Sequence, residues 1–300
     1  MKTILMKDKL TLASWRDYLE LCKPKVVLLM IITSLVGMCL SSSVFVGWPV
    51  LLFGNLGIAL AAASAAAVNH LADYRIDSMM ARTQGRPVVQ GKVSLIETLV
   101  FASTLCVLAM VVLLVFVNSL TALLTFLSMI GYAGVYTFYL KHNTSQNIVI
   151  GGLAGAAPPL LGAVAVTGHV TLMGVMLLLI IFVWTPPHFW ALAIDRVDEY
   201  AKVKIPMLPN THGILYTKRC IVIYTVLLLL VSLCPYFFGC SHLIYFVSAL
   251  ALGLWFLVGT LNLYRDEKNS CAMKVFKVSI MYLFLLFFAL LLDHYVVVMF

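Results

Sequence analysis

Charged side chains are scarce in this sequence. Asp, Glu, Lys and Arg make up 11% of the 300 residues, whereas hydrophobic residues make up 63%. Soluble globular chains carry about 25% charged residues, which cover their water-facing surface. The composition therefore excludes a soluble enzyme, a disordered chain and a secreted disulfide scaffold. It indicates a polytopic membrane protein, with room for about eight to ten helical spans.

Three further patterns are missing. Apolar and polar residues do not alternate as barrel strands require, since runs such as Leu105–Val117 are continuously apolar, so helices are expected. The seven cysteines are an odd number without metal-ligand spacing, which predicts neither a disulfide framework nor a zinc site. Residues 1–25 lack both the apolar core of a signal peptide and the Arg-rich, acid-poor pattern of a mitochondrial presequence. This favours a bacterial inner (plasma) membrane protein.

Positive charge falls only in alternate loops. All 20 Lys and Arg residues lie before the first of nine apolar runs or after the second, fourth, sixth and eighth. Because Lys and Arg mark cytoplasmic loops, the sequence predicts nine transmembrane helices with the N-terminus in the cytoplasm and the C-terminus outside. The same rule accounts for the net charge of +8 without a nucleic-acid partner. We expect a cytoplasmic segment 1–25 and one transmembrane domain 26–298, with spans near 26–46, 48–70, 94–117, 119–140, 148–168, 170–194, 220–239, 241–263 and 278–298.

Acidic residues gather where the second span reaches the cytoplasm. Asn69, Asp73 and Asp77 are spaced by four, so on a helix they lie within an arc of about 80°. Two carboxylates on one helix face repel each other, and acids near bilayer depth are unfavourable. A bound cation offsets both effects, and an all-oxygen ligand set suits Mg²⁺ together with substrate phosphates. The plainer alternative is a solvated loop after the helix.

A second acidic set ends the sixth span. Asp195, Asp198 and Glu199 fall within a helical arc of about 100°, and the sixth span also runs toward the cytoplasm. Four spans separate the two sets, which predicts two four-helix halves plus a ninth helix, with a central cavity open to the cytoplasmic side and a site between the halves. Two Mg²⁺ ions could then hold a diphosphate between the acids. Basic residues that could neutralise its oxygens are Arg75, Arg82, Arg86, Lys141 and Lys202.

These residues carry a family resemblance. The run from Asn69 to Asp77, continuing from Met80 to Pro87, resembles the first aspartate motif of the UbiA superfamily of intramembrane prenyltransferases. Within it, the chain is most similar to the protohaem IX farnesyltransferases, or haem O synthases. That likeness covers roughly residues 15–295; it includes 186–194 and 205–209, whose most specific parts are Pro-Pro-His-Phe-Trp at 186–190 and Pro-Met-Leu-Pro at 206–209. Other matching segments are Lys23-Pro24-Lys25, 147–152, 157–160, 282–284 and Asp293-His294.

The resemblance implies an activity. Enzymes of this subfamily join farnesyl diphosphate to a vinyl group of haem B, which gives haem O and diphosphate, with Mg²⁺ assisting the ionisation of the allylic diphosphate. Asn69, Asp73, Asp77, Asp198 and Glu199 are then the candidate catalytic residues, and both aspartates of the first set are metal ligands. The second motif departs from the usual Tyr-Arg-x-x-Asp-Tyr, because Asp195 replaces the tyrosine and Glu199 stands where Asp is usual. Asp198 and Glu199 rank first as ligands there, and Asp195 follows.

Aromatic residues and one histidine complete the expected site. Aromatic faces stabilise cations, and a chamber inside the bilayer shields an allylic cation from water. His188 follows Pro186-Pro187, which should kink the sixth span; it is a candidate to ligate haem iron or orient a propionate, or else a hydrogen-bonded interfacial histidine. The aromatic candidates are Tyr132, Tyr136, Tyr139, Phe189 and Trp190.

Several alternatives stay open at this stage. One is a related prenyltransferase with an aromatic acceptor such as 4-hydroxybenzoate. Another is a cation-coupled transporter. The position of the acids argues against it, because they lie at helix ends rather than at mid-span. A third is a haem-binding assembly factor without catalysis. The expected partners are farnesyl diphosphate, haem B and the lipid bilayer, and with them haem A synthase or a terminal oxidase as protein partners. The oligomeric state and the prenyl chain length stay open.

Overall fold

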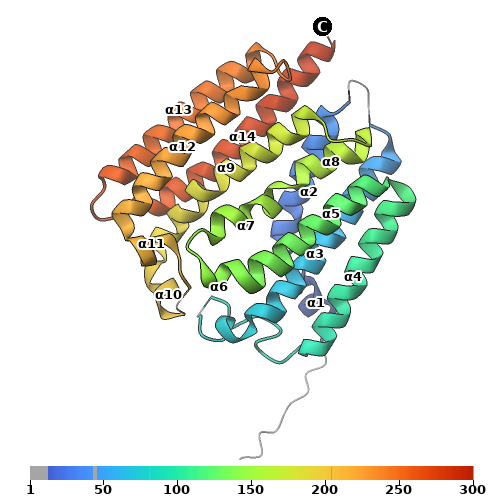
Figure 1. Cartoon of the computed structure of the whole chain (residues 1–300), viewed down its shortest axis with the longest axis vertical. Coiled ribbons are helices and arrows are strands. Elements are labelled where there is room, and N and C mark those ends of the chain that lie inside the picture. The colour runs from blue at the N-terminus through green and yellow to red at the C-terminus, as the bar shows by residue number, and fades with distance from the viewer. Residues whose placement is uncertain (1–12, 43–45, 81, 204, 300) are drawn as a thin grey trace, which may run out of the picture.

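Long runs of Leu, Val, Ala and Ile fold into long helices in the computed structural model, which describes residues 13–42, 46–80, 82–203 and 205–299. These ranges contain no strand, so the expected all-helical class is confirmed (Figure 1). The elements are α1 (Trp15–Leu21), α2 (Pro24–Leu40), α3 (Trp48–Asp77), α4 (Leu95–Phe116), α5 (Ser119–Ile130), η1 (Gly131–Leu140), α6 (Lys141–Asn143), α7 (Asn147–Ala156), α8 (Pro158–Thr167), α9 (Leu172–Asp195), α10 (Val197–Lys202), α11 (Leu208–His212), α12 (Ile214–Phe237), α13 (Leu243–Arg265) and α14 (Ala272–Met299).

Membrane-spanning capacity agrees with the expected architecture. Within the described ranges, eight helical segments are long and apolar enough to cross a bilayer, and a ninth is reached if α1 and α2, which meet at 55°, form one broken span. The expectation of nine is thus met only by counting that pair. Residues 1–12 of the expected N-terminal segment lie outside the described residues, and the rest of it forms α1 and the start of α2. The division of the chain at residue 25 stays a prediction.

Four span boundaries differ from the sequence expectation, since the first span ends at Leu40 rather than at 46 and the second continues to Asp77 rather than ending at 70. The seventh span starts at Ile214 rather than at 220, and the ninth starts at Ala272 rather than at 278. The seventh span therefore includes Lys218, a residue expected in the loop. Lys218 is nevertheless buried, because its ammonium group donates a hydrogen bond to the backbone carbonyl of Asp266. A satisfied buried lysine does not end a helix.

The two four-helix groups meet along α2 and α8. Gly37 lies against the backbone carbonyl of Pro159, and Gly162 lies against that of Ser34, so a methyl group at either glycine would clash with backbone. Small residues at a crossing let helix backbones approach closely inside a membrane. On either side of this crossing, α3 packs on α4, and α9 packs on α12, while α14 packs against α13, α9 and α2. In Figure 1, α4 and α13 lie at opposite edges of the bundle.

A π-helix interrupts the fourth span. The sequence predicts one continuous helix over 119–140, but α5 passes into η1 at Gly131. There the Thr137 hydroxyl donates to the carbonyl of Tyr132, five residues earlier, and the Lys141 amide donates to that of Tyr136. Such widened turns are frequent at functional sites, and this one stacks the rings of Tyr132 and Tyr136 at 5.4 Å.

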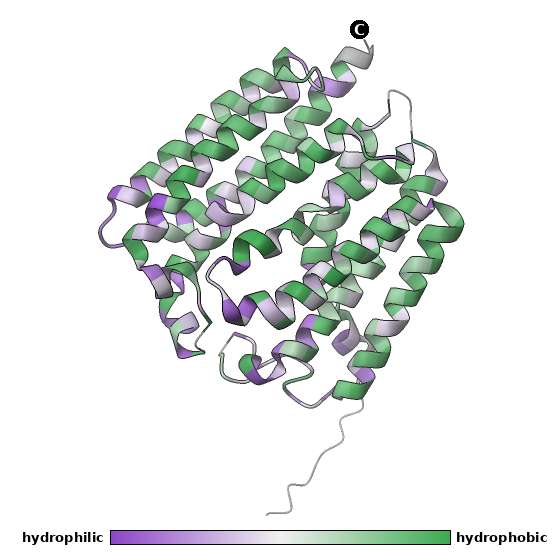
Figure 2. Cartoon of the chain, viewed as in Figure 1, coloured by the Kyte–Doolittle hydropathy of each residue, from purple (hydrophilic) through white to green (hydrophobic). Residues whose placement is uncertain are grey.

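Hydropathy separates the ends of the bundle from its middle. Figure 2 shows hydrophilic residues gathered at the end where α6, α10 and α11 lie, whereas the long helices are mainly apolar. Large apolar side chains such as Ile96 and Val107 on α4 are exposed. Exposed apolar helix faces of this extent suit contact with lipid rather than water. The chain is therefore a multi-pass membrane protein.

Candidate active site

The first acidic set lies at the polar end of α3. The helix continues without a break through Asp77, so the predicted helical spacing of the set is confirmed. Asn69, Asp73 and Asp77 are exposed by only 5%, 2% and 4%. The small residues from Ala61 to Ala67, just before the set, allow neighbouring helices to approach closely. The solvated-loop alternative is therefore wrong for this set.

Two cations pair with the buried carboxylates, and a third contacts Asn69 beside them. Lys141 Nζ lies 2.6 Å from Asp73 Oδ2, and Arg86 pairs with Asp77. Asn69 Nδ2 donates to Asp73 Oδ2 at 2.8 Å, while Lys23 Nζ donates to the Asn69 side-chain oxygen. Three cations thus surround two carboxylates, which leaves the cluster with one excess positive charge. Such a cluster suits a multiply charged anion.

One carboxylate oxygen is left open. Asp73 Oδ1 is buried and has no hydrogen-bond partner among the described residues, although Oδ2 of the same group has two. A buried carboxylate oxygen without a partner is energetically unfavourable unless a ligand completes it. A hard divalent cation such as Mg²⁺ suits such an oxygen. The first set therefore fits a metal ion through Asp73.

Lys23 is a site residue that the sequence reasoning did not select. It lies in the break between α1 and α2, and its φ of 49° is in the left-handed region. Pro24 begins α2 and disfavours the right-handed helical conformation for the residue before it, so the chain turns sharply here. The turn directs the Lys23 side chain inward. The Lys-Pro pair ahead of an apolar run was the available signal.

The second acidic set is arranged differently, and its expected arc on one helix is wrong: α9 ends at Asp195, Arg196 leaves the helical conformation, and Asp198 and Glu199 lie on the separate helix α10. Asp195, Asp198 and Glu199 are exposed, and so are Arg75, Arg82 and Lys202. In the part of the chain that the structure describes, no three His, Cys, Asp or Glu side chains come together as a metal site. The buried residue of this segment is Tyr200, and burial raises the pKa of its phenol against the opposing influence of Arg82 and Arg196. Metal binding by the second set stays a prediction.

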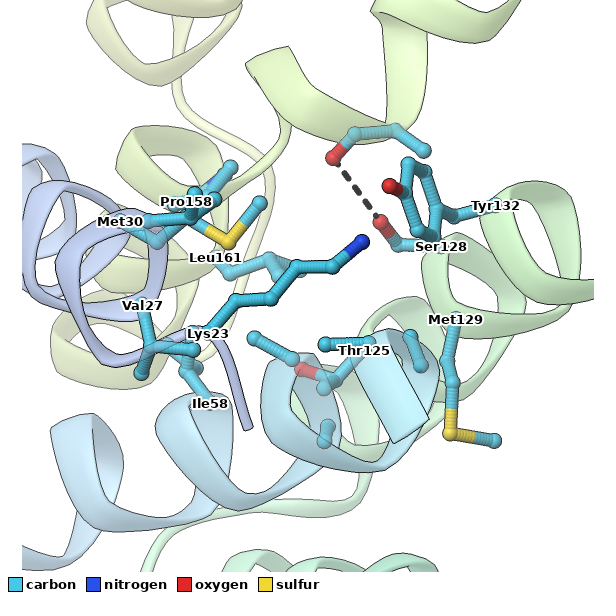
Figure 3. A pocket seen from close by; sticks show the side chains of 16 residues that line it. Lys23, Val27, Met30, Ile58, Thr125, Ser128, Met129, Tyr132, Pro158 and Leu161 are labelled. Atoms are coloured by element: carbon cyan, nitrogen blue, oxygen red, sulfur yellow. Dashed lines mark hydrogen bonds between the residues drawn. The ribbon is translucent and has the colours of Figure 1, made fainter. Parts of the chain in front are cut away.

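Two cavities share a wall, and the smaller is lined by Lys23, which contacts Asn69 of the first acidic set. The smaller, of about 60 Å³, lies between α2, α3, α5 and α8; Figure 3 shows the Lys23 side chain extending into it, with Tyr132 and Ser128 on its wall. The larger, of about 350 Å³, lies between α2, η1, α7 and α9 and is lined by Tyr136 and His188. Residues that line both are Val26, Met30 and Tyr132.

Two of the three tyrosines predicted from the sequence, Tyr132 and Tyr136, are brought to one region with His188. Tyr132 lines both cavities, and its ring stacks on that of Tyr136. Tyr136 packs directly on α7, where Gly151 leaves room for its ring. Phe189 lines the larger cavity, whereas Trp190 is buried on the other side and packs edge-on against Tyr224. Tyr139 is exposed.

Comparison with known proteins agrees with this geometry. The family model described as the UbiA prenyltransferase family matches residues 30–292. The chain belongs to the UbiA prenyltransferase family. Within it, the chain is 60% identical over 97% of both chains to a protoheme IX farnesyltransferase of Stutzerimonas stutzeri. It is 59% identical to one of Coxiella burnetii, over 98% of this chain and 97% of that one. The expected family and subfamily are confirmed.

Solved structures share the family fold. A digeranylgeranylglyceryl phosphate synthase has a TM-score of 0.80 at 20% identity and covers 93% of this chain and 98% of its own. A UbiA homologue of Archaeoglobus fulgidus, solved with GPP and Mg²⁺, has a TM-score of 0.66 at 14% identity and covers 91% of this chain and 99% of its own. At these identities the likeness supports the fold alone.

Proposed function

We propose that this protein transfers the farnesyl group of farnesyl diphosphate to haem B. The allylic C–O bond breaks, the farnesyl carbon joins a vinyl carbon of haem B, and one water adds to the other vinyl carbon; haem O and diphosphate leave. The observation that carries the proposal is the buried Asp73 with one open oxygen, ringed by cations and set beside apolar cavities. Near-full-length relatives at about 60% identity bear the name of this activity.

The cations of the first set bind the diphosphate in this proposal. Lys141, Lys23 and Arg86 are already held there by the carboxylates and Asn69, so substrate phosphate oxygens meet preorganised donors. Asp73, with Asp77 beside it, would hold a Mg²⁺ ion. When bound, that ion stabilises the negative charge that develops on the departing diphosphate. The acids then orient the phosphate end, and the carbon chain extends into the apolar cavities.

The cavities exclude water from the allylic cation. Their walls are mainly apolar, with Val26, Met30 and Tyr132 common to both. Tyr132 and Tyr136 present stacked rings at the junction of the cavities, where aromatic faces stabilise positive charge. A dry junction prevents premature capture of the cation by water.

In the same proposal, the second acidic set takes part only when the diphosphate and Mg²⁺ bind. Asp198 and Glu199, with Asp195 behind them, would bind a second Mg²⁺ on the opposite side of the diphosphate. Arg75, Arg82 and Lys202 would add positive charge around it. What supports this is the position of Asp195 at the end of α9 and of the other two acids on α10, which follows it directly; Arg75 and Arg82 lie in the last turn of α3 and in the loop after it.

We also propose the bacterial inner membrane, with the N-terminus and the cavity opening on the cytoplasmic side and the C-terminus outside. The one-sided distribution of Lys and Arg supports this orientation. Reporter fusions at Gly91 and His294 should then report opposite sides of the membrane. Reports from the same side would contradict the segmentation. Haem A synthase or a terminal oxidase would receive the product.

Mass spectrometry of haem tests the activity. Membranes that contain the protein, given farnesyl diphosphate and haem B, should yield haem O, and Asp73→Asn should abolish that peak. Glu267→Gln, which removes an exposed acid from the α13–α14 loop, is the matched control and should leave the yield unchanged. Farnesylated 4-hydroxybenzoate in place of haem O would instead establish an aromatic acceptor. Absence of Mg²⁺-dependent diphosphate release would indicate a transporter or a haem-binding assembly factor.

A further inference from the structure

His188 lies in an unusually constrained position in α9. The helix continues through Pro186 and Pro187, and the imidazole that follows is stacked between two rings. Trp184 lies 4.2 Å from it at 19° between planes, and Phe276 of α14 lies 4.5 Å from it at 26°. Both faces of the ring are therefore covered, and its orientation is held by two helices that are far apart in sequence.

Ser279 determines which ring nitrogen carries the hydrogen. The Ser279 hydroxyl lies 2.6 Å from the carbonyl oxygen of Phe276 and 2.6 Å from His188 Nδ1. Since the carbonyl oxygen can only accept, a Ser279 hydroxyl that donates to it accepts from Nδ1, and Nδ1 then carries the hydrogen. The neutral imidazole then has its lone pair on Nε2. Trp184 Nε1 donates to the Ser279 backbone carbonyl at 2.8 Å and holds this arrangement together.

The remaining edge of the ring borders the larger cavity. His188 lines that cavity, and with both faces stacked and Nδ1 bonded, the Nε2 edge is what it presents. Nε2 has no hydrogen-bond partner among the described residues. The rest of the lining is mainly apolar, with Ile148, Ile181 and Leu283. A hydrocarbon chain leaves such a lone pair unsatisfied, whereas a Lewis-acidic ligand completes it.

We propose that His188 Nε2 is an axial ligand to the iron of haem B, and that the cavity lined by His188 forms the inner part of the acceptor site. This inference rests on the proposed function, because haem B is taken as the acceptor. A metal-bound imidazole commonly donates its other N–H to an oxygen, as Nδ1 does to Ser279. Iron ligation fixes the centre of the macrocycle, so a vinyl group at its rim can face the junction at Tyr132, where the allylic carbon arrives.

Haem titration of the purified full-length chain tests the ligand directly. Ferrous haem with CO should give the absorption spectrum of an imidazole-ligated iron. His188→Ala should lose that spectrum and bind haem at least about tenfold more weakly, and added imidazole should restore both to His188→Gly. His212→Ala is the control and should titrate like the parent, because His212 is exposed and stacks on Tyr216 away from both cavities.

A second variant separates ligation from folding. Ser279→Ala keeps the imidazole but removes the acceptor for Nδ1–H, so we expect an altered spectrum and a two- to fivefold weaker affinity, roughly 0.4–1 kcal/mol. A parental spectrum and affinity in His188→Ala, or no response of His188→Gly to imidazole, would overturn the proposal.

The proposed function is judged separately by haem O formation. Asp73→Asn should bind haem like the parent and yet form no haem O. If the parent forms haem O while His188→Ala binds haem normally, only the ligand assignment fails. If the parent binds haem through His188 but never forms haem O, the proposed reaction fails.

Discussion

The first acidic set ends α3 and the second lies across the break between α9 and α10, yet only the first is buried. Asp73 and Asp77 are enclosed with Lys23, Lys141 and Arg86, whereas the acids of the second set are exposed to solvent. Buried carboxylates require partners, and exposed ones are satisfied by water. The comparison teaches that the fold preorganises the first set with its own cations and leaves the second set in contact with solvent.

Loss of Asp73 should have the largest effect. Asp73→Ala removes the open oxygen and leaves Lys141 without its partner, so farnesyl transfer should fall by at least about 100-fold. Stability should fall as well, by about 1–3 kcal/mol, because a largely buried cation loses its partner. Steady-state rates and thermal melts in detergent measure the two effects. Asp77→Ala should behave similarly. Crowded carboxylates alone would predict a stability gain on Asp73 removal, so a higher melting temperature would contradict the ion-pair arrangement.

A matched pair of lysines gives the next largest effect. Lys141→Gln removes a buried contact to Asp73 and should weaken farnesyl diphosphate binding about 10- to 100-fold, or roughly 1.4–2.8 kcal/mol. Lys202→Gln removes an exposed charge from the second half and should change binding by less than about threefold. Isothermal titration with a non-hydrolysable farnesyl diphosphate analogue compares them. Equal losses would show that the second half is as preorganised as the first.

The second acidic set should respond to the metal concentration. Asp198→Asn or Glu199→Gln should raise the Mg²⁺ concentration needed for half-maximal activity by about tenfold, or about 1.4 kcal/mol. Asp195→Asn should do less, since Asp195 closes α9 whereas Asp198 and Glu199 lie beyond it on α10. All three exposed positions should leave the melting temperature within about 1 °C. If all three variants titrate with Mg²⁺ like the parent, the second set binds no metal and the two-half model loses its main support.

The smallest effect concerns the contact between the halves. A methyl group at Gly151 of α7 would lie 2.2 Å from the Tyr136 ring of η1, whereas one at Gly155 meets nothing within 4 Å. Gly151→Ala should displace Tyr136, cost about 1–3 kcal/mol of stability and slow transfer a few-fold. Gly155 lines the larger cavity, as Gly151 does, so Gly155→Ala is the control. This substitution should leave the stability unchanged or raise it by up to about 1 kcal/mol. If the two variants behaved alike, displacing Tyr136 would have no effect of its own, and Tyr136 would not belong to the site.

Sequence reasoning recovered what depends on local periodicity and on composition. Apolar runs of bilayer length predict spanning helices, and the spacing of Asn69, Asp73 and Asp77 by four residues places them on one face of α3. The Lys-Pro pair at Lys23 was visible, but its contact with Asn69 was not. The seventh-span boundary was missed because Lys218 finds a backbone partner that only the fold supplies.

Tertiary structure decided which of two similar acidic sets is preformed and where the imidazole lone pair of His188 faces. Burial of Asp73, its pairing with Lys141 and the Ser279 contact that orients His188 all join residues on different helices. Periodicity reports only which residues share a face of one helix. Desolvation, ion pairing and tautomer depend on what the neighbouring helices bring to that face, and those neighbours are set by packing across the whole bundle.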